Sequence, residues 1–181
     1  MNRYLALLRG INVGGHNKVK MAQLKLLCES IGFADISTYI QTGNVLFSSR
    51  ETSLILQQQL EQALLSEFGF KLAVTIRSIE ALEAVQANLS IKDIDQLQDS
   101  SKLMVSFLSE IAPDNALQLL QPYLHSSERL QLSGTELYLY CPNGYGKTKL
   151  TNNLLEKKLV LTATTRNWKT LLKLCQLSLE R

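Results

Sequence analysis

The chain has 181 residues, of which 45% are hydrophobic and 19% are charged, and these values are typical of a folded globular protein. Its length suits one sizeable domain or two small ones. Its composition is incompatible with a disordered or fibrous protein. The apolar run in MNRYLALLRG ends too early for a signal peptide, and no stretch reaches the roughly 18 apolar residues of a membrane helix. We therefore expect a cytoplasmic protein that does not interact with membranes.

The charge is distributed unevenly, although the net value is only +3. Residues 1–28 carry five basic residues and no acidic one, and residues 141–173 carry seven basic residues against Glu156 alone. The middle segment, residues 29–140, has six basic and fourteen acidic residues. This asymmetry either reflects a positive surface built from both ends of the chain or scattered, solvated lysines.

Hydrophobic periodicity in the first half predicts a strand, a helix, two strands joined at Thr42-Gly43-Asn44, a helix and a strand. Gly32 supplies a stop signal for the first helix, and Ser78 is a candidate N-cap for a further helix after the last strand. The expected ranges are 3–9 for the first strand, 21–31 for the first helix, 36–49 for the two joined strands, 56–68 for the second helix, 71–78 for the last strand and 78–89 for the further helix.

The second half repeats this order after a polar, acidic stretch. A strand is followed by a helix that Pro113 opens, by two strands about Ser133-Gly134-Thr135, and by a helix, a strand and a closing amphipathic helix. The expected ranges are 102–108, 113–122, 128–141, 147–159, 159–164 and 167–179.

The order β-α-β-β-α-β in each half predicts an α+β protein of two tandem ferredoxin-like halves, with antiparallel sheets and packed helices. The expected division is residues 1–89 for the N-terminal half with a trailing helix, 90–101 for a linker, and 102–181 for the C-terminal half with the closing helix. The cysteines are Cys28, Cys141 and Cys175, with no CxxC pair, and we interpret them as buried reduced thiols.

Two glycine-rich stretches are candidates for anion binding. RGINVGGHNKVKM, residues 9–21, lies between a strand and a helix, but its glycines do not fit GxGxxG, so it is either a turn that needs positive φ or a phosphate loop. CPNGYGKTKL ends like a P-loop, but Cys141 occupies the position of the first glycine, and we exclude that motif. A glycine turn that opens a helix next to Lys147 and Lys149 would still attract an anion.

A third candidate is TATTRNWKT. Thr164, Thr165 or Asn167 could cap the closing helix, and Trp168 is expected to pack in the core. Arg166 could hold a carboxylate or a phosphate, although a charged helix start is the favoured interpretation. His16 and His125 are not spaced as metal ligands, and we expect no metal and no cofactor.

Taken together, YLALLRGINVGG, the lysine–methionine start of the first helix, TYIQTGNVLF, PNGYGKTKL and TATTRNWKT resemble one bacterial family, known as domain of unknown function 1697. The resemblance covers nearly the whole chain. It implies a small cytoplasmic bacterial protein of ferredoxin-like topology, and it implies no activity and no catalytic residues.

Three classes of function remain open. The first is a module that binds a phosphate, a nucleotide or nucleic acid in a basic cleft built from both chain ends; here Tyr138 and Tyr140 fall on one strand face and would form a stacking platform if exposed. The second is an enzyme acting on a small phosphorylated or carboxylated ligand, with His16 as the nearest base. The third is a regulatory module without a small ligand. The candidate anion-binding residues are Arg9, Gly10, Asn12, Gly14, Gly15, Lys18, Thr42, Gly43, Asn44, Asn143, Gly144, Gly146, Lys147, Arg166 and Asn167.

Overall fold

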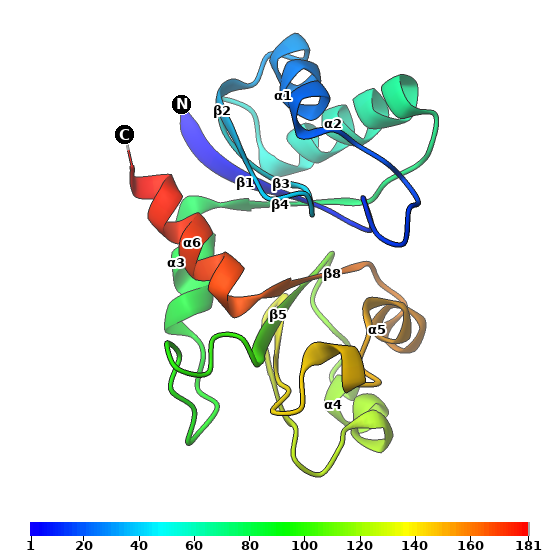
Figure 1. Ribbon diagram of the computed structural model, residues 1–181, viewed down its shortest axis with the longest axis vertical. Helices are drawn as coiled ribbons and strands as arrows, with labels where there is room; N and C mark the ends of the chain where they lie inside the picture. Colours follow the sequence, from blue (N-terminus) through cyan, green and yellow to red (C-terminus); the bar gives the residue numbers. More distant parts are fainter. Residues whose placement is uncertain (181) are drawn as a thin grey trace. The chain divides into compact units, whose positions relative to one another are not determined.

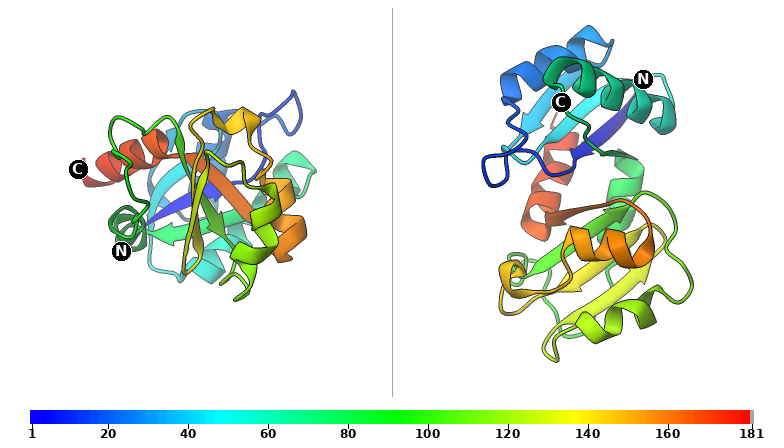
Figure 2. Two further views of the ribbon diagram at one scale, coloured as in Figure 1. Left: turned by 90° about the horizontal axis from the view of Figure 1, so that it is seen from below. Right: turned by 90° about the vertical axis from the view of Figure 1, so that its right-hand side faces the viewer.

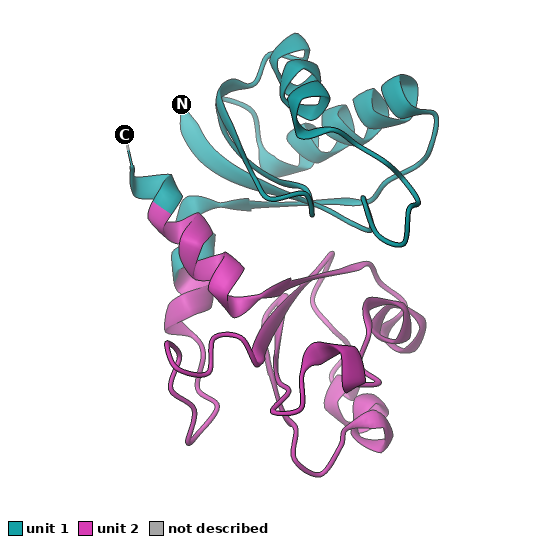
Figure 3. Ribbon diagram, viewed as in Figure 1, with its two compact units in different colours: residues 1–83, 177–181 teal, residues 84–176 magenta. Residues whose placement is uncertain are grey.

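The computed structural model describes residues 1–180, which form two compact units (Figures 1 and 3). Unit 1 comprises residues 1–83 and the chain from Leu177 onward, and unit 2 comprises residues 84–176. The division falls inside a helix that follows the first four strands, and the last turn of the closing helix is assigned to unit 1. Each unit contains one four-stranded sheet, and each is described by itself.

Unit 1 has a β-α-β-β-α-β order, and its sheet has the strand order β2-β3-β1-β4 with every neighbouring pair antiparallel. Both helices cover the same face of this sheet (Figures 1 and 2). The elements are β1 (Asn2–Leu8), α1 (Met21–Ser30), β2 (Ala34–Tyr39), β3 (Asn44–Ser49), α2 (Ser53–Phe68) and β4 (Val74–Ser78).

The core of unit 1 forms where the apolar faces of α1 and α2 meet alternate residues of the strands. Tyr4, Ala6 and Leu8 of β1 contribute one side, and the buried helix residues contribute the other. Cys28 belongs to this core, and burial, together with the nearby Glu29 carboxylate, raises the pKa of its thiol to about 12. The expectation that Cys28 is a buried core thiol is confirmed.

Unit 2 repeats the order, and its sheet has the strand order β6-β7-β5-β8, again antiparallel throughout. Helix α3 (Ile79–Ala87) precedes this repeat in the chain, and helix α6 (Trp168–Leu179) follows it. Each of these helices has residues in both units. The other elements are β5 (Leu103–Leu108), α4 (Ala116–Leu120) with the 3₁₀ turn η1 (Gln121–Tyr123), β6 (Arg129–Ser133), β7 (Glu136–Tyr140), the 3₁₀ turn η2 (Tyr145–Lys147), α5 (Asn152–Leu159) and β8 (Ala163–Asn167).

The core of unit 2 lies between the sheet and the pair α4 and α5 (Figure 2). Cys141 is buried there, and burial, with the Glu128 carboxylate as a second cause, raises the pKa of its thiol to about 12. Cys175 on α6 is only half-buried, which differs from the expected burial of all three thiols, and no disulfide joins Cys28, Cys141 and Cys175. Trp168 is fully buried, with its ring centroid 6.1 Å from that of Tyr138, as expected for a core tryptophan.

Each unit has, within its own sheet, backbone hydrogen bonds at positions equivalent to those of the other. The amide of Leu8 donates to the Gly43 carbonyl at 2.9 Å, and the amide of Leu108 donates to the Thr135 carbonyl at 2.8 Å. The next residue in each strand, Arg9 or Ser109, donates to the chain just before β4 or β8. The strand order and these bonds are those of two ferredoxin-like halves, so the predicted α+β fold class is confirmed.

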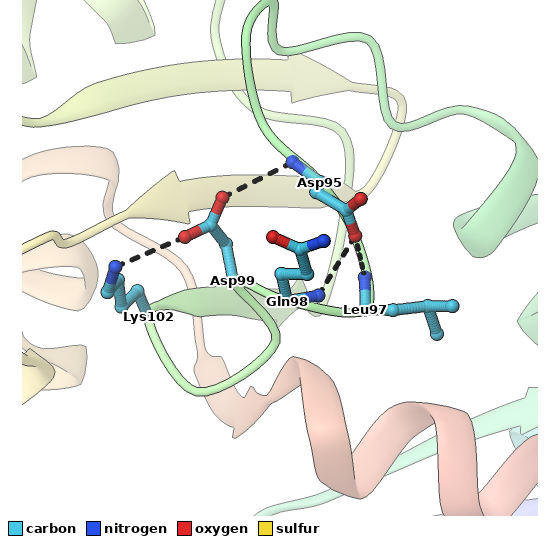
Figure 4. A network of polar contacts seen from close by, with 5 residues as sticks. All are labelled: Asp95, Leu97, Gln98, Asp99 and Lys102. Carbon is cyan, nitrogen blue, oxygen red and sulfur yellow. Dashed lines mark hydrogen bonds and ion pairs between the residues drawn. The ribbon is translucent and has the colours of Figure 1, made fainter.

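Within the acidic stretch at 90–101, the residues from Asp95 onward form a hydrogen-bonded turn that reaches Lys102 (Figure 4). Asp95 Oδ1 accepts from the amides of Leu97 and Gln98, both at 2.9 Å. Asp99 accepts from the Asp95 amide at 3.2 Å and forms an ion pair with Lys102 at 3.2 Å. These carboxylates therefore have a structural role in closing the turn.

The bounds of three elements in unit 2 differ from the sequence-based expectation, and the first of these is α4, which begins at Ala116 rather than at Pro113. The helix predicted from Lys147 begins at Asn152, because Thr151 caps it by accepting from the Leu154 amide, and Lys147 lies in the separate turn η2. The strand predicted at 159–164 is β8, which begins at Ala163 and extends to Asn167, because α5 continues to Leu159 and ends at Val160. The prediction that the glycine turn opens a helix is therefore wrong.

Across residues 1–180, no helix is both long and apolar enough to cross a membrane. Within the same range, no three His, Cys, Asp or Glu side chains are grouped so that they could hold a metal ion.

Candidate functional site

The candidate site in unit 1 lies at one edge of the sheet, where the loop 9–20 leaves β1 and the turn 40–43 joins β2 to β3. β1 and β2 each pair with β3 in the antiparallel sense, so their carboxyl ends lie at the same edge. The hydrogen bond from Leu8 to Gly43 joins this end of β1 to the turn. The topology thus brings two separate glycine-containing segments together.

Asn12 fastens these two segments to each other. Its side-chain amide nitrogen donates to the Val19 carbonyl at 2.9 Å and to the Gln41 carbonyl at 2.8 Å, and its oxygen accepts from the Val19 amide at 2.9 Å. The Asn12 backbone has φ 55°, a left-handed conformation that asparagine tolerates better than most residues. Because both amide protons are already used, Asn12 shapes the loop and its donors are not available to a ligand.

The turn 40–43 leaves no room for a side chain at Gly43. A Cβ atom there would lie 2.7 Å from Ile11 Cδ1 and 2.8 Å from Leu8 Cβ, and the φ of 80° favours glycine independently. Asn44 is fully buried, and its side-chain nitrogen donates to the Tyr39 carbonyl at 2.9 Å and to Thr42 Oγ1 at 3.1 Å. Thr42, Gly43 and Asn44 therefore hold the turn that carries Gln41.

A pocket of about 420 Å³ lies beside this junction, and its volume is within the range of small-molecule sites. Lys18 and Lys20 are exposed, they flank the buried Val19, and no carboxylate within residues 1–180 pairs with either ammonium group. The pocket is lined by Asn12, Gly15, Lys18, Val19, Lys20 and Gln41.

The pocket borders the N-terminus of α1. Lys20 occupies the N-cap position, no side chain caps the helix there, and the first turn contains no acidic residue. Uncapped amides and the positive end of the helix dipole add to the potential of the two lysines. The arrangement is electropositive, and an anion would be stabilised there more than a cation.

The other predicted residues of this loop have different surroundings. The Arg9 amide donates to the Ala73 carbonyl at 2.9 Å, and the Gly10 carbonyl accepts from the Asn17 side chain at 3.2 Å. Gly10, Gly14 and Gly15 all have positive φ, which confirms that the loop needs glycine for its backbone conformation. His16 is exposed and is not among the residues that line the pocket.

The glycine loop of unit 2 follows β7 and uses its amides internally. The Gly144 amide donates to the Cys141 carbonyl at 2.9 Å, and the Lys147 amide donates to the Gly144 carbonyl at 3.1 Å. The Asn143 side chain donates to Ser127 Oγ at 3.3 Å. Gly146 and Lys147 are exposed, so Lys147 remains a surface cation of this loop.

Arg166 and Asn167 lie at the end of β8. In the sheet of unit 2, this end lies at the same edge as the end of β7. Arg166 lies opposite Val105 of β5 and is 9% exposed, and one of its terminal nitrogens donates to the Thr165 carbonyl at 3.0 Å. Asn167 caps α6 by accepting from the Lys169 amide at 2.9 Å. Of the three capping candidates, the structure therefore selects Asn167, and Arg166 belongs to the strand.

The predicted stacking platform of unit 2 is closed to a ligand. Tyr138 is fully buried and its hydroxyl donates to the Val85 carbonyl at 2.9 Å. Burial, with the Glu136 carboxylate as a second cause, raises the pKa of Tyr138. Tyr140 is half-buried, so this strand does not present two exposed rings to a base.

A family model described as "Protein of unknown function (DUF1697)" matches residues 1–138, about three quarters of the chain. The chain belongs to this family. The solved structure of the conserved bacterial protein SP0830 from Streptococcus pneumoniae is similar to this DUF1697 chain, with 28% identity, a TM-score of 0.76 and 97% of each chain covered. No curated protein matches the chain.

Sequence reasoning on this DUF1697 chain selected Asn12, Gly15 and Lys18, which line the pocket, but not Val19, Lys20 or Gln41. The alternation of Lys18 and Lys20 about an apolar residue was the available signal for Lys20, because an extended chain places residues two apart on one side. Gln41 carries no such signal, since it reaches the pocket only through the pairing of β2 with β3.

Proposed function

We propose that the pocket beside α1 binds a small phosphate-bearing ligand, with Lys18 and Lys20 as its charged contacts. The observation that supports this is the pair of exposed lysines on one pocket, with no acidic partner for either in residues 1–180. An ammonium group is a strongly hydrated point charge with three donors, and it suits a phosphate oxygen.

The pocket favours binding over catalysis. Its six lining residues include no carboxylate and no histidine, the side chains that most often act as general bases. Its volume of about 420 Å³ fits a small molecule, and the buried Tyr138 removes the ring platform that single-stranded nucleic acid would need in unit 2. A phosphorylated small molecule is therefore preferred to nucleic acid.

The test is a titration with inorganic phosphate, followed by calorimetry or by the thermal shift of unfolding. We expect Lys18→Ala and Lys20→Ala each to weaken binding by about fivefold, the effect of one solvent-exposed charge pair. High salt should weaken binding to the unmodified chain because both lysines are exposed. Lys25→Ala is the matched control, since Lys25 is exposed on α1 but does not line the pocket.

Equal losses for Lys18→Ala and Lys25→Ala would show that any binding is nonspecific. Anion binding by the second basic segment is a separate prediction, and its candidate residues are Asn143, Gly144, Gly146, Lys147, Arg166 and Asn167. Lys147→Ala tests it, because Lys147 is exposed and its removal leaves the amide bonds of the loop in place. If Lys147→Ala binds phosphate as tightly as the unmodified chain, unit 1 acts alone.

A further inference from the structure

The loop and turn that form the pocket also expose two branched apolar side chains. Val13 is 63% exposed and Ile40 is 45% exposed. Val13 follows the pocket residue Asn12, and Ile40 precedes the pocket residue Gln41. The Asn12 side chain donates a hydrogen bond of 2.8 Å to the Gln41 carbonyl. This bond joins the loop and the turn at the residues next to Val13 and Ile40.

Ile40 is held in an unfavourable backbone conformation. Its φ is 53°, in the left-handed region, where a β-branched residue is a genuine outlier. The surroundings impose this conformation, because Asn44 holds the Tyr39 carbonyl at 2.9 Å and Gly43 packs against Ile11 and Leu8. Strain of this kind is typical of ligand-binding segments, and an asparagine at position 40 would have relieved it.

The pocket itself combines charge with an apolar surface. Val19 contributes to its lining although it is only 1% exposed, and the aliphatic stems of Lys18 and Lys20 add further apolar area. A free phosphate ion would use the two ammonium groups and leave this surface, Val13 and Ile40 in water. A ligand with an apolar group would remove that surface from water as well.

We infer that the ligand is a phosphate monoester of an aromatic or aliphatic alcohol, and that Val13 and Ile40 contact its organic group. This inference rests on the proposed function, since the phosphate is held by Lys18 and Lys20. A sugar phosphate fits less well, because its hydroxylated body gains little from two exposed apolar side chains.

The experiment compares phenyl phosphate, glucose 6-phosphate and inorganic phosphate by calorimetry on the full chain. We expect phenyl phosphate to bind about tenfold more tightly than the other two, as burial of part of a ring would give. Ile40→Asn and Val13→Ser should each remove most of this difference and leave the affinity for inorganic phosphate unchanged. Leu54→Gln is the control, because Leu54 is 64% exposed on α2 and lies outside the loop 9–20 and the turn 40–43 that carry the lining residues.

Ile40→Asn should fold, since asparagine tolerates positive φ, and its melting temperature should rise above that of the unmodified chain. If phenyl phosphate and inorganic phosphate bind equally tightly, and Lys18→Ala weakens the binding of both, the inference is overturned and the proposed function stands. An equal loss of both ligands in Ile40→Asn would overturn it too. Absence of binding of all three probes would overturn the inference and the proposed function together.

Discussion

Asn12 and Val19 close the loop between β1 and α1 through two hydrogen bonds of 2.9 Å, one in each direction between the Asn12 side chain and the Val19 backbone. A third bond, from Asn12 to the Gln41 carbonyl, joins this closed loop to the turn after β2. Val19 is 1% exposed, so the loop is held against the core of unit 1 at this residue. Asn12 therefore connects the loop and the turn that line the proposed pocket.

Replacement of Asn12 by alanine should destabilise the chain by about 1–3 kcal/mol, because the Val19 amide and carbonyl and the Gln41 carbonyl lose their partner. The melting temperature should fall by roughly 2–4 °C for each kcal/mol. Asn143→Ala is the matched control, since the bond of Asn143 to Ser127 measures 3.3 Å and is exposed. Urea unfolding of both variants measures the difference, and equal midpoints would contradict the role of Asn12.

Gly43→Ala should be far more costly than Gly69→Ala, although both glycines have nearly the same φ, 80° and 75°. A Cβ at Gly43 would meet Leu8 and Ile11 below 3.0 Å, whereas a Cβ at Gly69 would meet nothing within 4 Å. We expect a loss of about 1 kcal/mol at Gly69 from the left-handed backbone alone, and about 3 kcal/mol or more at Gly43, where overpacking adds to it. If the two variants unfold at the same urea concentration, the turn is less tightly packed than the structure shows.

Val160→Gly should stabilise the chain by about 0.5–1 kcal/mol, the net of relieved backbone strain and added chain entropy. Val160 ends α5 with φ 57° and is 85% exposed, so its side chain contributes little packing. The equivalent helix of unit 1, α2, ends at Gly69 in the same conformation. A rise in melting temperature tests this prediction, and a fall would mean that the exposed Val160 side chain makes a stabilising contact.

The turn at 95–102 should weaken in acid. The amides of Gln98 and Leu97 hold the pKa of Asp95 below its ordinary value. The charged carboxylate therefore stabilises the folded turn fully above the unfolded pKa of about 4, and this contribution is lost as the pH falls through the lowered folded value. The protection factors of the Leu97 and Gln98 amides, which compare the measured exchange rate with the intrinsic rate at each pH, should therefore fall in acid.

The variant Asp95→Asn provides the comparison for this titration. Its side-chain oxygen retains an acceptor, but it has no charge that titrates, so the exchange of the Leu97 and Gln98 amides should lose its acid-dependent step. The surface ion pair between Asp99 and Lys102 remains in this variant. An unchanged pH dependence would show that another group controls the turn.

The local elements of this fold could be predicted from the sequence because their signals are short-range. Alternation in Leu103, Val105 and Phe107 marked β5, Gly32 marked the end of α1, and Ser78 accepts from the Ala81 amide as a cap should. The start of α5 was missed, because Lys147 and Thr148 follow a glycine turn as a helix start would, whereas the cap is Thr151. The end of α5 carries no glycine, and Val160 takes the left-handed conformation in its place.

The sequence by itself determined the two repeated sets of strands and helices and the turn at Thr42-Gly43-Asn44, because these depend on side-chain alternation and on local backbone preferences. Only the tertiary structure decided which residues line the pocket. Asn12 and Gln41 are 29 residues apart, and they meet because β3 pairs with both β1 and β2 and places the two strand ends at one edge. Strand pairing is a long-range interaction, and no local pattern around Gln41 contains it.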